Sequence, residues 1–309
     1  ASGRDKVAVC GYHGWHDWYL SANIRNRKNL DELLMKNVPI KGVPKNLSGT
    51  IFPFEYNNFE SLKKITDNYK IGTIKMEVKR NHDPKNKILE KVRKLATEKS
   101  IILIFDECTS GFREAYGGLH KIYNICPDMA IFGKALGNGY AINSIIGKRS
   151  IMEACTDTFI SSTFWTERIG FVAGLETLKS MERLESWNII TKLGKKIKKN
   201  WKKISKIHDL KIDVMGLDAI PNFSFKSNLN LHYKTFISQE MLKKKILAAN
   251  TIFCSIAHKD KIIDDYFNIL DDIFLKIKKC RGEKKNIEAL LETKLCLEGL
   301  RNKAKYKND

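Results

Sequence analysis

Two short segments carry side chains that could do chemistry together. The segment IILIFDECTSGFR places Asp106 and Glu107 after five apolar residues, and PDMAIFGKALGNG places Lys134 after another apolar run. Ligands of open, parallel α/β sheets bind at the edge where the strands end. A carboxylate at this edge could pair with a positive group, and a lysine amine there could attack a carbonyl.

Each segment also has a plain structural explanation. An acid at the end of a strand can cap a neighbouring turn, and a lysine there can point into water, which is common in a chain with 44 lysines. Burial of Lys134 would instead free its amine as a nucleophile, and Gly137 and Gly139 would let the chain turn close to a ligand. A lysine that forms a Schiff base, with a carboxylate for a pyridinium nitrogen, is the recurring arrangement of enzymes that use pyridoxal 5'-phosphate (PLP).

The octet GYHGWHDW, near the start of the chain, is the third chemically dense segment. His13, His16 and Asp17 form a conceivable set of metal ligands, but no other cluster of ligands accompanies them. Packing explains Trp15 and Trp18 better than chemistry does. We therefore predict no metal site.

Composition narrows the class of protein. The 309 residues, 43% of them hydrophobic, are enough for one large and one smaller globular domain. The seven cysteines are odd in number and form no C-x-x-C, so we expect a reducing, cytoplasmic location rather than a disulfide framework. The longest clean apolar run, Ile101–Phe105, is too short to cross a membrane, so no membrane partner is predicted.

The formal charge of +20 raises nucleic acid as a partner. However, the excess comes from 44 lysines against 11 arginines, and arginine is favoured for bidentate recognition of phosphates and bases. In the basic stretch Lys192–His208, apolar residues recur at steps of three and four, as in an amphipathic helix with a solvated basic face. We predict no nucleic-acid partner.

Short apolar runs alternate with helical patterns in the first half of the chain. The expected strands lie at residues 7–10, 72–77, 101–105 and 129–132, and the expected helices at 60–69 and 87–99. This alternation favours an α/β fold with a mostly parallel sheet flanked by helices.

The pattern changes near Ser186, after a long helix expected from Glu167 past Met181. Beyond it we expect helices, including one at 262–277, and short strands, including one at 252–254. The predicted domains are a large cofactor-binding domain at 1–185, incomplete at its N-terminus, and a smaller C-terminal α+β domain at 186–309 with a charged helical tail.

The order of several motifs resembles the class III aminotransferases of the type I PLP fold, most closely the glutamate-1-semialdehyde aminomutase subgroup. The resemblance covers most of residues 1–280. Its blocks are YHG at Tyr12, FEYNN at Phe54, IKMEV at Ile74, DECTSGFREAYGG at Asp106, PDMAIFGKALGNG at Pro127, SSTFWTERIGFVAGLETL at Ser161 and QEMLKKKIL…FCSIAHKDKIID from Gln239.

The resemblance implies roles for individual residues. Lys134 would form the Schiff base with PLP and move protons, and Asp106 would pair with the ring nitrogen. Tyr12 would stack on one face of the ring, with His13 close by, and Cys108 would cover the other face. Asp106 and Lys134 are thus the predicted catalytic residues.

The resemblance also implies a homodimer. Thr163 would reach the phosphate of the PLP bound by the neighbouring subunit, Glu77 would lie near a small amino or keto substrate, and Arg113 would be structural. Two departures from the family put the choice of substrate in doubt: Val78 replaces a usual proline, and residues 164–167 replace a usual Gly-Asn-Pro.

Relatives have a portion before the YHG block that holds the cofactor phosphate and the substrate carboxylate. This chain starts after that portion, so we expect an N-terminally truncated form that binds the cofactor poorly by itself. The predicted activity is PLP-dependent amino-group transfer, between two molecules in an aminotransferase or within one in an aminomutase. The alternative is a catalytically silent fragment or homologue that acts as a binding protein.

Overall fold

The computed structural model describes residues 1–31, 33, 38–280 and 283–296. The chain forms two compact units, Ala1–Glu185 and Ser186–Asp309, which are described separately. Among the helices described, none combines the length and the apolar composition that crossing a membrane requires.

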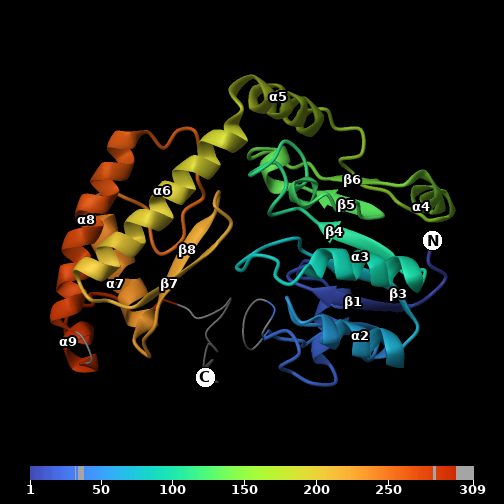
Figure 1. The fold of residues 1–309 in the computed structure, drawn as a ribbon, viewed down its shortest axis with the longest axis horizontal. Helices are drawn as coiled ribbons and strands as arrows, with labels where there is room; N and C mark the ends of the chain where they lie inside the picture. The colour runs from blue at the N-terminus through green and yellow to red at the C-terminus, as the bar shows by residue number, and fades with distance from the viewer. Residues whose placement is uncertain (32, 34–37, 281–282, 297–309) are drawn as a thin grey trace, which may run out of the picture. The chain divides into compact units, whose positions relative to one another are not determined.

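The first unit is built on a six-stranded sheet with the order β2-β1-β3-β4-β5-β6 (Figure 1). Its strands are β1 (Lys6–Cys10), β2 (Ile51–Pro53), β3 (Ile71–Met76), β4 (Ile102–Asp106), β5 (Met129–Phe132) and β6 (Ser144–Gly147). All neighbouring pairs are parallel except β5 and β6, which are antiparallel. The predicted mostly parallel sheet is therefore confirmed, and the two short edge strands, β2 and β6, are additions to it.

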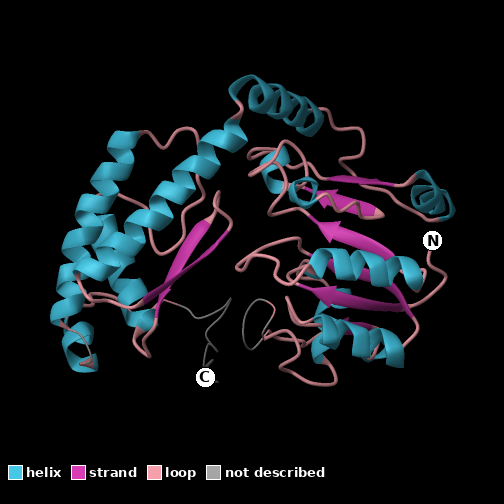
Figure 2. Cartoon of the chain, in the orientation of Figure 1, coloured by secondary structure: helices cyan, strands magenta, loops and turns pink. Residues whose placement is uncertain are grey.

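Two amphipathic helices connect successive parallel strands of the sheet, and Figure 2 shows them beside the strands. They are α2 (Phe59–Asn68) and α3 (Ile88–Glu98). The Asn58 side chain caps α2 by accepting a hydrogen bond from the Ser61 amide at 3.1 Å. On α3, Leu89 and Val92 are buried, as their spacing predicts.

The other helical segments of this unit are mostly short. They are α1 (Asp17–Leu20), η1 (Ser21–Asn23), η2 (Lys45–Leu47), η3 (Leu119–Tyr123), η4 (Lys134–Leu136), α4 (Arg149–Met152), η5 (Glu153–Asp157) and α5 (Ile169–Leu184). The helix expected from Glu167 begins two residues later because the Glu167 carboxylate accepts hydrogen bonds from the amides of Ile169 and Gly170. Glu167 thus satisfies free amides at the start of α5 instead of extending the helix.

The second unit packs helices against a two-stranded sheet. Its elements are α6 (Ser186–Ile207), β7 (Ile212–Gly216), β8 (Pro221–Phe225), α7 (Asn230–Lys243), α8 (Asp260–Lys279) and α9 (Lys284–Ala289). The aromatic residues Trp201, Phe223 and Phe274 are fully buried in its core. The apolar spacing of Lys192–His208 therefore does mark a helix with one buried face.

Two details of the second unit differ from the expected elements. Residues 252–254 do not form a strand: Thr251 makes one isolated antiparallel bridge with Asn222, and the amides of Ile252 and Cys254 donate to the carbonyls of Pro221 and Ala219 without forming a ladder. The charged tail has one short helix, α9, while residues 297–309 lie outside the described part of the chain.

Candidate active site at the ends of the parallel strands

The sheet topology brings the predicted site residues to one edge. The parallel strands β1, β3, β4 and β5 are successive neighbours, so their carboxyl ends lie side by side. Cys10, Met76, Asp106 and Phe132 are the last residues of these strands. The segments that follow them carry Tyr12, His13, Glu77, Cys108 and Lys134.

Asp106 is the centre of the cluster. Its carboxylate is largely buried, and its Oδ2 accepts a hydrogen bond from His13 Nδ1 at 3.0 Å. The Lys75 ammonium lies 3.3 Å from the same oxygen, and the Cys108 amide donates to Oδ1 at 3.2 Å. Burial alone would raise the pKa of Asp106, but the His13 hydrogen bond and the Lys75 charge outweigh it and lower that pKa. Asp106 is therefore an anion at neutral pH.

The pKa of the Cys108 thiol is shifted in the opposite direction to that of Asp106. Burial, together with the negative charge of Asp106, raises the pKa of Cys108 to about 11. The thiol is thus neutral near pH 7 and behaves as a small apolar group rather than as a nucleophile.

Glu77 holds the loop that presents Tyr12. Its Oε2 accepts a hydrogen bond from the Tyr12 amide at 3.0 Å, and its carboxylate pairs with Arg80 Nη1. The backbone of Gly11 has φ +106°, and a side chain there would put Cβ 2.4 Å from Glu77 Oε2. Glycine is needed both for this conformation and for the close approach of Glu77.

Lys134 combines an unusual backbone with an accessible amine. Its φ of 43° lies in the left-handed region, which is sparsely populated for residues other than glycine and is frequent at functional sites. Its Nζ donates a hydrogen bond to Thr109 Oγ1 at 2.7 Å. Partial desolvation, followed by the nearby Arg80 charge, lowers the pKa of Lys134. This shift increases the fraction of free amine that can attack a carbonyl.

Glu107, next to Asp106, has a structural role. It is fully buried, and its carboxylate accepts hydrogen bonds from Ser110 Oγ and from both the amide and Nδ1 of His120. Arg113 likewise supports the loop, because its Nε donates to the Thr109 carbonyl at 2.8 Å. These contacts fix the segment that carries Cys108 and Thr109.

Thr163 is the predicted residue that does not join this cluster. It lies on an exposed segment between η5 and α5, and none of its described contacts reaches the residues around Asp106. Conversely, Lys75, Arg80 and Thr109 belong to the cluster but were not predicted as site residues. The signal for Lys75 was a lysine between buried Ile74 and Met76 in a mostly apolar strand.

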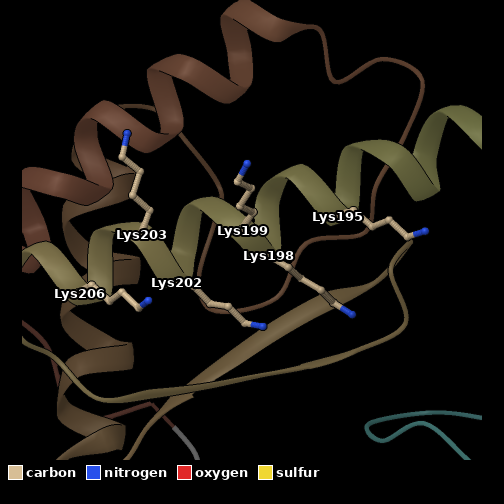
Figure 3. Close-up of a pocket in the computed structure, with 6 residues that line it drawn as sticks. All are labelled: Lys195, Lys198, Lys199, Lys202, Lys203 and Lys206. Carbon is tan, nitrogen blue, oxygen red and sulfur yellow. The ribbon is translucent and has the colours of Figure 1, made fainter.

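Two other groups of polar side chains in the described part of the chain give weaker evidence for a functional site. His16 Nε2 donates to the His13 carbonyl at 3.0 Å, and no group of three or more His, Cys, Asp or Glu residues described here could hold a metal ion. A surface groove in the second unit is lined by six lysines of α6, namely Lys195, Lys198, Lys199, Lys202, Lys203 and Lys206. Their ammonium groups point to different sides of α6 and do not converge (Figure 3).

The cluster has the groups that a pyridine aldehyde such as PLP requires. The Asp106 carboxylate can accept the ring N–H, the half-buried Tyr12 ring and the neutral Cys108 thiol offer contact surfaces, and Lys134 offers an amine. In addition, His13 Nε2 is buried without a hydrogen-bond partner among the described residues. Such an orphaned polar atom is typical of a site that a ligand or water completes.

Comparison with known protein sequences supports the same family as the motifs do. The model of the aminotransferase class-III family matches residues 81–259, more than half of the chain. The 3-aminobutyryl-CoA aminotransferase of Cloacimonas acidaminovorans is 33% identical over 236 residues, which are 74% of this chain and 53% of that protein. The glutamate-1-semialdehyde 2,1-aminomutase of Saccharolobus islandicus is 28% identical over 274 residues, 82% of this chain and 63% of that protein. The chain thus spans between half and two thirds of the length of these relatives.

Solved structures show the same fold at low sequence identity. FumI of Sphingopyxis sp. MTA144, solved in a PLP form, has a TM-score of 0.79 at 18% identity and covers 94% of this chain and 69% of its own. An omega-transaminase from Sphaerobacter thermophilus has a TM-score of 0.76 at 16% identity and covers 90% of this chain and 69% of its own. With the ordered motifs, the strand-end cluster and the match over residues 81–259, these findings show that the chain belongs to the class III aminotransferase family.

Proposed function

We propose that the protein binds PLP in the Asp106 cluster and uses it to transfer an amino group. The observation that carries the proposal is the placement of an accessible amine, Lys134, and an ionised carboxylate, Asp106, at the ends of neighbouring strands. When bound, PLP supplies an aldehyde that condenses with amines and a ring that accepts the electrons of a carbanion.

The side chains of the cluster have distinct roles in this proposal. Asp106 keeps a proton on the ring nitrogen, and His13 orients Asp106 through the 3.0 Å hydrogen bond. Tyr12 stacks on one face of the ring and Cys108 covers the other. Lys134 would hold the cofactor through its amine and would move protons at the reacting carbon of the substrate. Glu77 positions Tyr12 and faces the substrate together with Arg80.

The active unit in this proposal is a homodimer. Large apolar side chains of one segment are exposed in the single chain: Phe159, Phe164, Trp165, Ile169, Phe171 and Val172. So many large, exposed apolar side chains in one segment are unusual on a monomer and are typical of an interface. Thr163 lies within the segment, so association through it would carry Thr163 toward the cofactor phosphate of the partner subunit.

A small amino or keto compound is the proposed substrate. One relative is named for transfer between two molecules and the other for rearrangement within one. Lys134 and Asp106 would serve either reaction, so the substrate must be found by experiment. Turnover of glutamate-1-semialdehyde by the PLP-loaded protein without a second substrate would assign the aminomutase reaction. A requirement for both an amino donor and a keto acceptor would assign aminotransfer.

Covalent trapping tests the central claim. The protein is incubated with PLP, reduced with borohydride and digested, and the modified peptide is identified by mass spectrometry. We expect the pyridoxyl group on Lys134. Lys121→Ala, which removes a lysine bonded to the Tyr116 carbonyl, is the control and should leave the labelling unchanged. A label distributed over many surface lysines, without preference for Lys134, would refute the proposal.

Hybrid dimers test the role of Thr163. Lys134→Ala and Thr163→Val subunits, each expected to have little activity alone, are unfolded, mixed and refolded together. If Thr163 acts across the interface, each mixed dimer has one intact site, and an equal mixture regains about a quarter of the wild-type activity. No regain of activity would place Thr163 outside the partner's site.

A catalytically silent binding protein is not favoured, because the amine, the carboxylate and the contacts that position them are all present.

A further inference from the structure

Lys75 reaches the centre of the cluster from inside a strand. In the register between β3 and β4, Lys75 pairs with Ile104. Asp106 is two residues beyond Ile104, and side chains two residues apart in a strand lie on the same face. The sheet itself therefore directs the Lys75 ammonium toward Asp106, and the distance from Nζ to Oδ2 is 3.3 Å.

The surroundings of this ion pair are poorly hydrated. The side chains of Lys75 and Asp106 are 15% and 8% exposed. The ammonium also lies over the Trp18 ring, with 5.7 Å from Nζ to the ring centroid. Charges removed from water interact more strongly, and loss of one partner leaves the other uncompensated.

The Asp106 carboxylate has three donors before any ligand is considered. The Cys108 amide binds Oδ1, while His13 Nδ1 and the Lys75 ammonium share Oδ2. The pyridinium N–H of a bound cofactor would therefore be a fourth donor, and it would share the carboxylate with a fixed positive charge.

We propose that Lys75 is a positioning residue that weakens the hold of Asp106 on the protonated ring nitrogen of the cofactor. This inference rests on the proposed function. The ammonium partly neutralises Asp106 and repels a second positive charge, so it reduces, without removing, the stabilisation that Asp106 gives to the protonated ring. In the protein without cofactor, the same ammonium stabilises the buried carboxylate.

Two ligands are compared, so that the effect of Lys75 at the ring nitrogen can be separated from its attraction to the cofactor phosphate. Dissociation constants are measured for PLP and for its 1-deaza analogue, in which carbon replaces the ring nitrogen. Their ratio reports only the interaction at that nitrogen. Because repulsion between nearby like charges is weakly screened at a poorly hydrated site, we expect Lys75→Met to increase the preference for PLP at least about tenfold.

Three variants complete the comparison. Lys75→Arg keeps the charge and should leave the ratio near the wild-type value. Lys75→Gln is a second neutral variant that keeps a polar end, in case Lys75→Met does not fold. Lys6→Met removes a lysine of β1 that packs on Tyr69, away from Asp106, and should change nothing. In a second readout, the chemical shift of ¹⁵N in the ring of bound PLP should move toward the protonated form in Lys75→Met.

The outcomes separate this inference from the proposed function. If the wild-type protein does not bind PLP, both fail. If it binds PLP but the neutral variants leave the ratio and the ¹⁵N shift unchanged, the proposed function stands and Lys75 has no role at the ring. A lower melting temperature without cofactor, together with an unchanged ratio, would also overturn the inference, since Lys75 would then only stabilise the fold.

Discussion

Positive charge has very different surroundings in two regions of this molecule. At the strand ends, Lys75 pairs with Asp106 of β4, and Lys134 donates a hydrogen bond to Thr109 of the loop that follows β4. On α6, Lys199, Lys202, Lys203 and Lys206 are exposed and form no ion pair with another residue in the described part of the chain. Lys75 and Lys134 thus have specific polar partners at the strand ends, whereas these four lysines of α6 have none among the described residues.

The difference is one of desolvation and geometry, not of the number of charges. Lysines on a helix face remain hydrated and screened by salt, so each retains ordinary properties. Lys134 is partly removed from water near Arg80, and its pKa is lowered as a result. A basic groove is therefore a weaker indication of function than one lysine held at the end of a buried strand.

The largest expected effect that tests this contrast comes from Lys134→Ala. Loss of the amine proposed to bond the cofactor should lower turnover by at least about 10³-fold and abolish the covalent label. Steady-state rates and mass spectrometry of the reduced complex measure both. Lys199→Ala on α6 is the matched control and should keep wild-type values. Equal losses in the two variants would remove the distinction between the regions.

A second large effect is expected from Asp106→Asn. The amide cannot stabilise a protonated ring nitrogen as a carboxylate does, so turnover should fall by at least about 10²-fold while covalent attachment at Lys134 persists. The neighbouring variant Glu107→Gln should instead lower the free energy of unfolding by about 1–3 kcal/mol, since it disturbs buried hydrogen bonds. A turnover loss in Glu107→Gln as large as that in Asp106→Asn, at full folding, would contradict these separate roles.

The contrast between Asp106 and Glu107 shows what the sequence could and could not predict. Two adjacent acids at the end of β4 carry no local signal that separates them. The fold separates them, because Asp106 is the last residue of β4, whereas Glu107 belongs to the loop that follows and meets other partners there. The family resemblance pointed to Asp106, whereas the contacts of Glu107 with Ser110 and His120 depend on a loop that closes over thirteen residues.

The fold was more predictable than the site. Buried parallel strands are continuous apolar runs, and these located β1, β3, β4 and β5 within a residue or two. The edge strand β6 and the wrong strand at 252–254 depend on partners distant in sequence, which local patterns do not encode. Lys75 was overlooked for a similar reason: its partner, Asp106, is 31 positions away and meets it only through the sheet register.

A third prediction concerns pH. The folded-state pKa of Asp106 is lowered, so its ionised form stabilises the folded protein above the unfolded-state pKa of about 4, and this contribution is lost as the pH falls through the folded-state pKa. Asp106→Asn should therefore be most destabilising near neutral pH, and the difference from wild type should shrink in acid. Urea unfolding at a series of pH values measures this difference. If the difference in free energy of unfolding grew as the pH fell, Asp106 would not be the stabilising anion assigned here.

The smallest effect is expected on α6. Replacement of Lys199, Lys202, Lys203 and Lys206 by glutamine removes four exposed charges that pair with no described residue, so the free energy of unfolding should change by no more than about 0.5 kcal/mol per site. Relief of repulsion along the helix makes a slight stabilisation the favoured sign. Thermal unfolding at low and high salt separates this repulsion from packing, since only repulsion is screened.

Lys198→Gln is the control for the four α6 substitutions, because Lys198 bonds to Asp218 at 2.8 Å and to the Gly216 carbonyl at 2.7 Å. It should destabilise more than any of the four, even though it lies on the same helix and carries the same charge. If instead the four exposed lysines proved the more costly to replace, or if their loss reduced amino-group transfer, the basic face of α6 would have a specific partner. The strand-end lysines would then not be the only ones whose surroundings give them a function.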